Sequence, residues 1–394
     1  MRLLRYARND SEWLRTIRQC LVVFFLSRTL ILFIIVLSSQ VSLEEIPGRE
    51  GRNYHPIIAL NFEETISDLE AVLLSGDASW YIGIAKDGYD HESSPSLVPR
   101  NWTFFPFFPA LLRLTHILTG NYFIAGILIA NLSFIASLIV FANLGPRLGY
   151  TAEETSRALW LLAFFPTSYF FSAPHTEAVF LLLVLLSYLA LTHGRLLLAG
   201  GIFALAGATR PTGLLLLPGF ALSLFTHSNI PMPRRFVTVS LASLGGLAFM
   251  GYLYYLTGDP FAFASNQLHW GRGEQSTLEL LQGFIAVPGK LMIGWNFLLL
   301  NALCAVMALG IGIRLYLTGR KDFALIVVLP VAIALSTGTV QSLARFVVVL
   351  FPVFLWLGQF ATAREREWAL IAIFTTLLTL MAAMYGAHLT AGMA

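Results

Sequence analysis

The sequence predicts an all-α protein that crosses a membrane about eleven times, and three observations lead to this fold class. Hydrophobic residues make up 57% of the 394 residues. Asp, Glu, Lys and Arg together make up only 12%, roughly half the share that soluble domains carry. The apolar residues gather into runs close to the ~20 residues that a helix needs to cross the hydrocarbon layer of a bilayer. This composition excludes an ordinary soluble enzyme and a nucleic-acid-binding protein.

Eleven apolar runs are candidate spans, although several are short or interrupted by Pro and Gly. They are residues 20–41, 121–144, 157–173, 175–192, 196–210, 212–226, 236–257, 286–315, 323–338, 345–361 and 368–390. The first run follows a basic N-terminal segment and has no clear cleavage site, so we expect a retained span with its basic end in the cytoplasm. We expect residues 1–394 to form a single transmembrane domain.

A twelfth apolar stretch, residues 102–118, decides on which side every later loop lies. It contains two prolines, Arg113 and His116, and its aromatic residues suit the membrane interface better than the bilayer centre. If this stretch stays on the outer surface, the main arginine clusters of the later loops face the cytoplasm, as the bias of Lys and Arg requires. The sequence therefore predicts eleven spans and an extracytoplasmic C-terminus.

Residues 42–120 are predicted to form the first extracytoplasmic loop, which is by far the longest loop of the chain. Eleven of the 22 Asp and Glu residues fall between residues 42 and 103. Residues 62–86 have the spacing of an amphipathic helix that lies along the membrane surface. Because structureless loops of this length are uncommon unless they are functional, we expect this loop to carry interfacial helices and part of the functional site.

Asp77 is the first candidate for chemistry, since it begins a short helical stretch in this loop. A carboxylate at the rim of an apolar, water-poor cavity suits a general base. Trp80 and Tyr81 follow within one turn and offer flat faces on which a sugar ring can pack. The alternative is a structural role, in which Asp77 caps the helix by accepting hydrogen bonds from free backbone N–H groups.

Four further polar residues lie where apolar runs begin or end. Glu177, with His175 two residues before it, starts a span, and an ionisable group at this depth is a functional candidate. The alternative is an acid that the positive end of the helix dipole stabilises. Arg210 and Arg345 need anionic partners if they are buried, either a carboxylate or a phosphate. For both arginines the alternative is an ion pair with Glu177 or a side chain that reaches back to the surface.

Another predicted outer loop, residues 258–272, mixes aromatic and polar side chains and contains Gln267, Trp270 and Arg272. These residues suit stacking and hydrogen bonding with a sugar or a lipid headgroup, and they equally suit an aromatic belt at the membrane interface. No pair of histidines has the spacing of metal ligands. We therefore predict neither a metal site nor a cofactor, and the sequence leaves a requirement for a free divalent metal open.

Six stretches, in this order, resemble the GT-C glycosyltransferases, and within them the family of the second GPI mannosyltransferase (PIG-V) and its prokaryotic relatives. They are GDASWYIGIAKDGY, FFPFFPALLRL, FFPTSYFFSAPHTEAVFLLL, GGIFALAGATRPTGLLLLP, GDPFAFASNQLHWGR and LARFVVVLFPVFL. Together they reach from about residue 76 to residue 355. Gly76, His175 and Phe346 differ from the residues usual in that family.

The resemblance implies an integral-membrane transferase that moves a hexose, typically mannose, from a polyprenyl-phosphate carrier to a lipid or glycan acceptor outside the cytoplasm. The acid in the first outer loop is the catalytic base of that class, and the matching residue is Asp77. In an inverting displacement, Arg210 first and Arg345 second would stabilise the leaving phosphate without a metal. The residues expected to bind substrate are Trp80, Tyr81, His175, Glu177, Gln267, Trp270 and Arg272.

The competing function is a transporter or a flippase for a lipid or lipid-linked sugar. Such a protein places charged residues at mid-membrane on broken, pseudo-repeated helices. In this sequence the notable polar residues gather at one predicted face beside an acidic loop, which favours an outward-facing enzyme. A transferase-like scaffold that binds without turnover is the third possibility. The expected partners are the lipid-linked donor, the acceptor and membrane lipids, and no nucleic acid.

Overall fold

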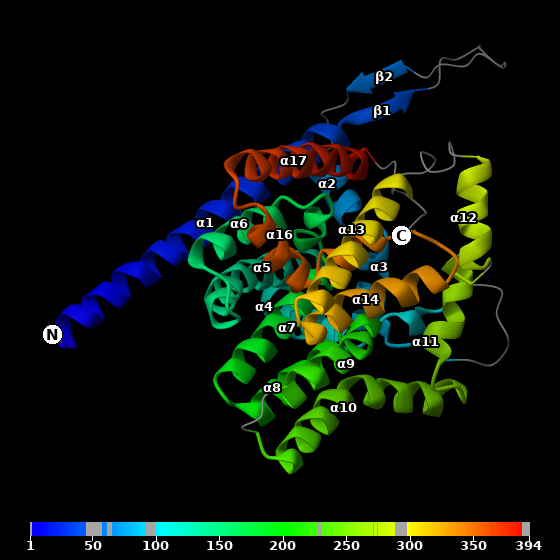
Figure 1. Ribbon diagram of the computed structural model, residues 1–394. Helices are drawn as coiled ribbons and strands as arrows, with labels where there is room; N and C mark the ends of the chain where they lie inside the picture. The colour runs from blue at the N-terminus through cyan, green and yellow to red at the C-terminus, as the bar shows by residue number, and fades with distance from the viewer. Residues whose placement is uncertain are drawn as a thin grey trace.

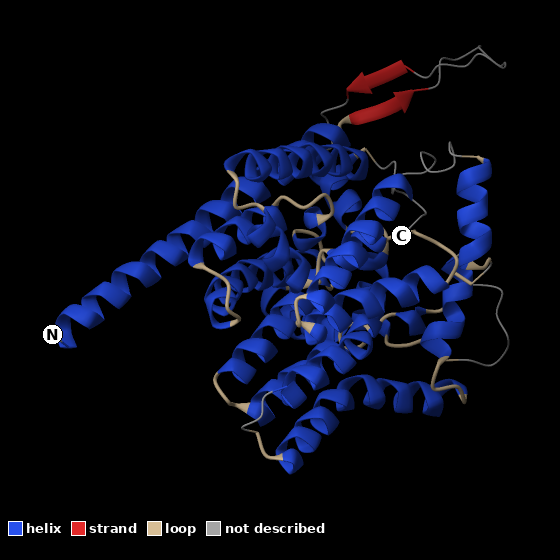
Figure 2. Ribbon diagram, in the orientation of Figure 1, coloured by secondary structure: helices blue, strands red, loops and turns tan. Residues whose placement is uncertain are grey.

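The computed structural model describes residues 2–44, 57–60, 65–91, 99–226, 230–270, 272–273, 275–287 and 298–387. These residues form a bundle of α-helices from which one antiparallel ribbon extends (Figures 1 and 2). The ribbon consists of β1 (Val41–Glu44) and β2 (Ile57–Leu60), with Val41 opposite Leu60. The all-α membrane fold that the composition predicts is confirmed, and the short ribbon is an addition that the sequence did not indicate.

Five of the described helices are long and apolar enough to cross a membrane. They are residues Trp13–Ser39 within α1 (Arg2–Ser39), α5 (Tyr122–Arg147), α10 (Met232–Thr257), α13 (Leu298–Leu317) and α17 (Arg364–Gly386). Shorter apolar helices complete the bundle: α4 (Phe107–Thr119), α7 (Glu177–Thr192), α8 (Leu196–Gly207), α9 (Pro211–Thr226), α12 (Thr277–Ala286) and α16 (Phe351–Phe360). The structure confirms a polytopic protein, whereas the number of eleven spans stays a prediction.

Three predicted spans are divided or shortened in the structure, and the span at 345–361 is one of them, because it consists of α15 (Leu343–Val347) and α16 (Phe351–Phe360). The span at 157–173 is divided, because α6 (Ala152–Ala163) ends early and a short 3₁₀ helix, η2 (Ser168–Phe171), follows it. The span predicted at 286–315 begins later, since α12 ends at Ala286 and α13 starts at Leu298, with residues 288–297 outside the described part. Pro166 explains the early end of α6, because a proline cannot continue the hydrogen-bonded helix.

The helix predicted over residues 62–86 exists in two pieces, α2 (Thr65–Leu73) and α3 (Asp77–Asp87). The break lies at Gly76, whose φ of 66° falls in the left-handed region that glycine adopts without strain. The stretch 102–118 is likewise divided, into the end of a 3₁₀ helix, η1 (Asn101–Thr103), and α4, which packs against α3 and α5 and exposes Leu118. The turn at Gly76 makes Asp77 the first residue of α3, and the Asp77 side chain meets Arg345 inside the bundle.

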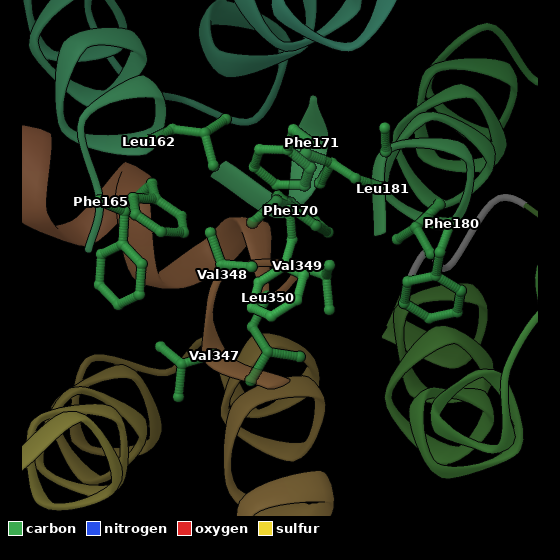
Figure 3. Packing of buried hydrophobic residues seen from close by; sticks show 14 of the residues in the cluster. Leu162, Phe165, Phe170, Phe171, Phe180, Leu181, Val347, Val348, Val349 and Leu350 are labelled. Atoms are coloured by element: carbon green, nitrogen blue, oxygen red, sulfur yellow. The ribbon is translucent and has the colours of Figure 1, made fainter. Parts of the chain in front are cut away.

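The core of the bundle surrounds the short helix α15 (Leu343–Val347) and the turn that leads into α16. Val347, Val348 and Leu350 have no exposed surface, and neither has the aromatic ring of Phe171. Figure 3 shows these side chains packed between the elements that carry Phe165 and Phe180. The chain segment that holds Arg345 is therefore enclosed by apolar side chains on several sides and has little freedom to move.

Close packing of α8 against α10 depends on Gly245, and this contact yields a stability prediction. A Cβ atom at Gly245 would lie 1.7 Å from the carbonyl oxygen of Ala204. Gly245→Ala is therefore expected to destabilise the protein by about 1–3 kcal/mol, seen as a lower unfolding temperature in detergent. A Cβ atom at Gly251 in the same helix would have no other atom within 4 Å, so Gly251→Ala should be neutral or slightly stabilising. Equal unfolding temperatures for the two variants would contradict this packing.

Candidate active site

A cavity of about 210 Å³ lies where the ends of several helices meet. Its wall comes from the start of α3, the start of α9, the loop before α12, the end of α14 (Lys321–Ser336), and α15. Seven of the ten predicted site residues line it: Asp77, Tyr81, Arg210, Gln267, Trp270, Arg272 and Arg345. Residues that are far apart in the sequence thus meet at one cavity, whose described lining contains a single carboxylate and three guanidinium groups.

A chain of ion pairs runs through the polar side of this cavity. Arg345 Nη1 lies 2.5 Å from Asp77 Oδ2, and Arg345 Nε donates to Glu177 Oε1. Arg210 Nη1 donates to the same oxygen of Glu177, and also to Thr176 Oγ1 at 3.1 Å. The four charged residues therefore alternate in sign, in the order Asp77, Arg345, Glu177 and Arg210.

These contacts decide between the alternatives that the sequence left open for the charged residues. Asp77 does not cap α3: the N-cap is Gly76, and the Asp77 carboxylate pairs with Arg345. Arg210 and Arg345 are 7% and 8% exposed, so neither reaches back to the surface. Both form the ion pair with Glu177 that was one alternative, and both line the cavity as well.

His175 and Glu177, which the sequence predicts to bind substrate, do not line the cavity, and direct contact of either residue with substrate stays a prediction. Glu177 is the first residue of α7, has no exposed surface and does not line the cavity. His175 is 1% exposed and packs edge-on against Phe170, with 5.0 Å between the ring centres. Glu177 therefore acts on the cavity through Arg210 and Arg345, which do line it, and His175 packs in the buried core.

Trp80 is also placed behind the wall and not in it. Its ring stacks on Phe104 with 5.6 Å between the ring centres, and meets Trp270 edge-on at the same distance. Tyr81 packs edge-on against Phe104 from the other side, at 5.1 Å. Tyr81, Phe104 and Trp270 thus line the cavity together with Phe346, and Trp80 packs against Phe104 and Trp270 without lining it.

Arg272 is the third arginine that lines the cavity. Its Nη2 donates to the Gln341 carbonyl oxygen at 3.1 Å, and its Nη1 donates to Thr337 Oγ1 at 3.4 Å. Arg272 lies 5.4 Å from the centre of the Phe346 ring, and Arg210 lies 5.8 Å from the same ring. Burial lowers the pKa of the Arg272 guanidinium to about 10, so this residue remains a cation at neutral pH.

Sequence reasoning missed the residues that fix Arg345. Ser342, the N-cap of α15, has a φ of 62°, which is strained for a residue other than glycine. The backbone of Ala344 is held from both sides, because its carbonyl oxygen accepts from Thr167 Oγ1 at 3.0 Å and its N–H donates to Asn301 Oδ1 at 2.8 Å. Single Ser, Thr and Asn residues carry no motif, so no signal in the sequence could have identified them.

Asn266 was missed for the same reason, although it joins two loops of the cavity wall. Its Nδ2 donates to the Arg100 carbonyl oxygen at 2.6 Å and to Thr103 Oγ1 at 2.9 Å. Its Oδ1 accepts from the Arg100 backbone N–H at 3.2 Å. This clamp brings the loop of Phe104 beside the loop of Trp270. Within the described ranges, no group of three or more His, Cys, Asp and Glu side chains is arranged to hold a metal ion.

The comparisons with known proteins bear on the middle of the chain. Residues 101–226, about a third of the chain, match the family model MptA_B, described as alpha-(1->6)-mannopyranosyltransferase, N-terminal domain. The match supports a mannosyltransferase of the GT-C type. The matched range includes Glu177 and Arg210 and excludes Asp77 and Arg345. Neither a curated protein nor a solved structure matches the chain.

A mannosyltransferase implies a sugar donor and a lipid or glycan acceptor. Together with the apolar helices, the match therefore supports a glycosyltransferase that resides in a membrane. The finer resemblance to PIG-V, the polyprenyl-phosphate carrier and the side of the membrane stay predictions.

Proposed function

We propose that this protein is an inverting glycosyltransferase of the extracytoplasmic membrane face, with Asp77 as its general base. It takes a hexose, mannose in the first instance, from a polyprenyl-phosphate-linked donor and transfers it to a lipid or glycan acceptor. The observation that carries the proposal is one partly exposed carboxylate beside three arginines in a cavity of about 210 Å³.

Inverting transfer needs one base and a means to stabilise the leaving group. Arg345 engages Asp77 Oδ2, so we expect Oδ1 to accept the proton of the acceptor hydroxyl. The acceptor oxygen forms a bond to the anomeric carbon as the bond from that carbon to the phosphate oxygen breaks. The electron pair of the broken bond goes to the polyprenyl phosphate, and the cavity arginines stabilise the added negative charge.

The rest of the cavity suits the two ends of such a donor. Tyr81 and Trp270 offer ring faces and edges against which a hexose can pack. Leu215 of α9 and Ile333 of α14 add apolar lining, and Ile333 is 40% exposed at the surface. The volume is below the roughly 300–1,000 Å³ of sites that enclose drug-sized ligands, which suits a sugar phosphate whose lipid chain stays outside.

The test of this function is the choice of donor by purified protein in vesicles. We expect transfer of labelled mannose from polyprenyl-phosphate-mannose and no transfer above background from a nucleotide-diphosphate mannose, which has no lipid chain. Equal transfer from the two donors would contradict the proposed donor class. Movement of the lipid-linked sugar across the vesicle membrane without any transfer would instead support the competing flippase function.

A further inference from the structure

The three arginines of the cavity differ in how far their charges are already compensated. Arg210 and Arg345 both bind the buried Glu177, and Arg345 binds Asp77 as well. Two guanidinium groups thus face two carboxylates, and the net charge of this group of four residues is zero. An added anion gains little from a pair that is neutral as a whole, and displacing Glu177 from its arginines would leave a carboxylate unpaired in the core.

Arg272 forms no ion pair with a carboxylate of the described residues. The two groups that accept its hydrogen bonds, the Gln341 carbonyl oxygen and the Thr337 hydroxyl, are neutral. Among the cationic side chains that line the cavity in the described part of the chain, it is the one without an ion pair. The Phe346 ring and the two hydrogen bonds hold its guanidinium in place. Asp77 raises the pKa of Arg272 through space, but its carboxylate forms its ion pair with Arg345. A guanidinium that is partly withdrawn from water and has no direct ion pair is suited to an anionic ligand.

We infer that Arg272 is the residue that binds the phosphate of the sugar donor. This inference rests on the proposed function and deepens it, because it distinguishes the arginine that holds the donor from the two that complete the ion-pair chain. A phosphodiester carries one negative charge, which equals the one positive charge that the described lining of the cavity leaves unpaired. Arg210 then serves mainly as a counter-ion of Glu177. Arg272 therefore replaces Arg210 as the first candidate for the phosphate ligand.

The experiment measures binding of farnesyl-phosphate-mannose, a short lipid-linked sugar, to the purified full chain in detergent without acceptor. Arg272→Gln is expected to weaken the affinity about 10- to 100-fold, because a hydrogen bond to a charged group contributes about 1.5–3 kcal/mol. Arg272→Lys keeps the positive charge but not the planar pair of N–H donors of the guanidinium, so it should retain more donor affinity than Arg272→Gln. Arg113→Gln, at an exposed position of α4, removes the same charge and is expected to bind like the wild type.

The steady-state transfer assay gives a second readout that a merely structural role would not move. Arg272→Gln should raise KM for the donor much more than it lowers kcat, with an unchanged unfolding temperature. The inference would be overturned if Arg272→Gln bound the donor with wild-type affinity, or if Arg113→Gln lost donor affinity to the same extent. In either case, sugar transfer by the wild-type protein would still uphold the proposed function. Binding that depends on Arg272 in a protein that transfers no sugar would overturn the proposed function and uphold the inference.

Discussion

Asp77→Asn is expected to lower kcat for sugar transfer about 10²- to 10⁴-fold, the range that a general base contributes. Asparagine has nearly the same shape as aspartate, but it cannot take a proton from the acceptor. Arg345 stays bound to Glu177 in this variant, so the cavity wall is expected to keep its shape. The loss should therefore appear in kcat, with donor affinity changed much less.

The control for this prediction lies in the same helix. Asp87 is the last residue of α3, is exposed and does not line the cavity. Asp87→Asn removes the same charge and should transfer labelled mannose at a rate within about twofold of the wild type. Equal rates for Asp77→Asn and Asp87→Asn, in proteins with equal unfolding temperatures, would show that Asp77 is not the base.

Glu177→Ala is expected to be the most destabilising single change at the site. Removing one partner of a buried ion pair costs about 3–5 kcal/mol, because the remaining charge stays buried without compensation. Here Arg210 loses the one carboxylate that it pairs with among the described residues, and Arg345 loses one of two. We expect a large drop in unfolding temperature, or protein that cannot be purified in a folded form.

The exposed Glu153 in the first turn of α6 provides the comparison. Surface substitutions away from special contacts usually change stability by less than about 0.5 kcal/mol, so Glu153→Ala should unfold close to the wild type. Glu177→Gln keeps the shape of the side chain, and we expect an intermediate loss. If Glu177→Ala unfolds at the temperature of Glu153→Ala, the buried ion-pair chain does not contribute to stability as described.

The fold class could be predicted because charged residues are so scarce that the long apolar runs are easily recognised in the sequence. The bounds of the helices were harder to predict, as the division of residues 62–86 into two helices shows. A single glycine is tolerated within an amphipathic helix, so the pattern around Gly76 gave no reason to place a break there. Pro166 causes the early end of α6. The apolar residues on both sides of this proline made the segment look like one continuous span.

The site could be predicted as a set of residues but not as an arrangement. Polar residues in turns between apolar runs are rare, which is why Asp77, Arg210 and Arg345 were found. Sequence spacing does not reveal how a turn rotates a side chain, so it could not show that Glu177 is fully buried and does not line the cavity. The inference that Arg272 is the unpaired cation of the described cavity lining required the partners of all three arginines, and only the structure provides them.

The most direct test of the central claim is a single-turnover transfer from labelled polyprenyl-phosphate-mannose, measured together with donor binding, for the wild type and Asp77→Asn in vesicles. If Asp77 is the general base of a lipid-linked glycosyltransferase, the wild type transfers the label and Asp77→Asn binds the donor with similar affinity but transfers it at least about 100-fold more slowly. Transfer at the wild-type rate by a folded Asp77→Asn protein would contradict the account.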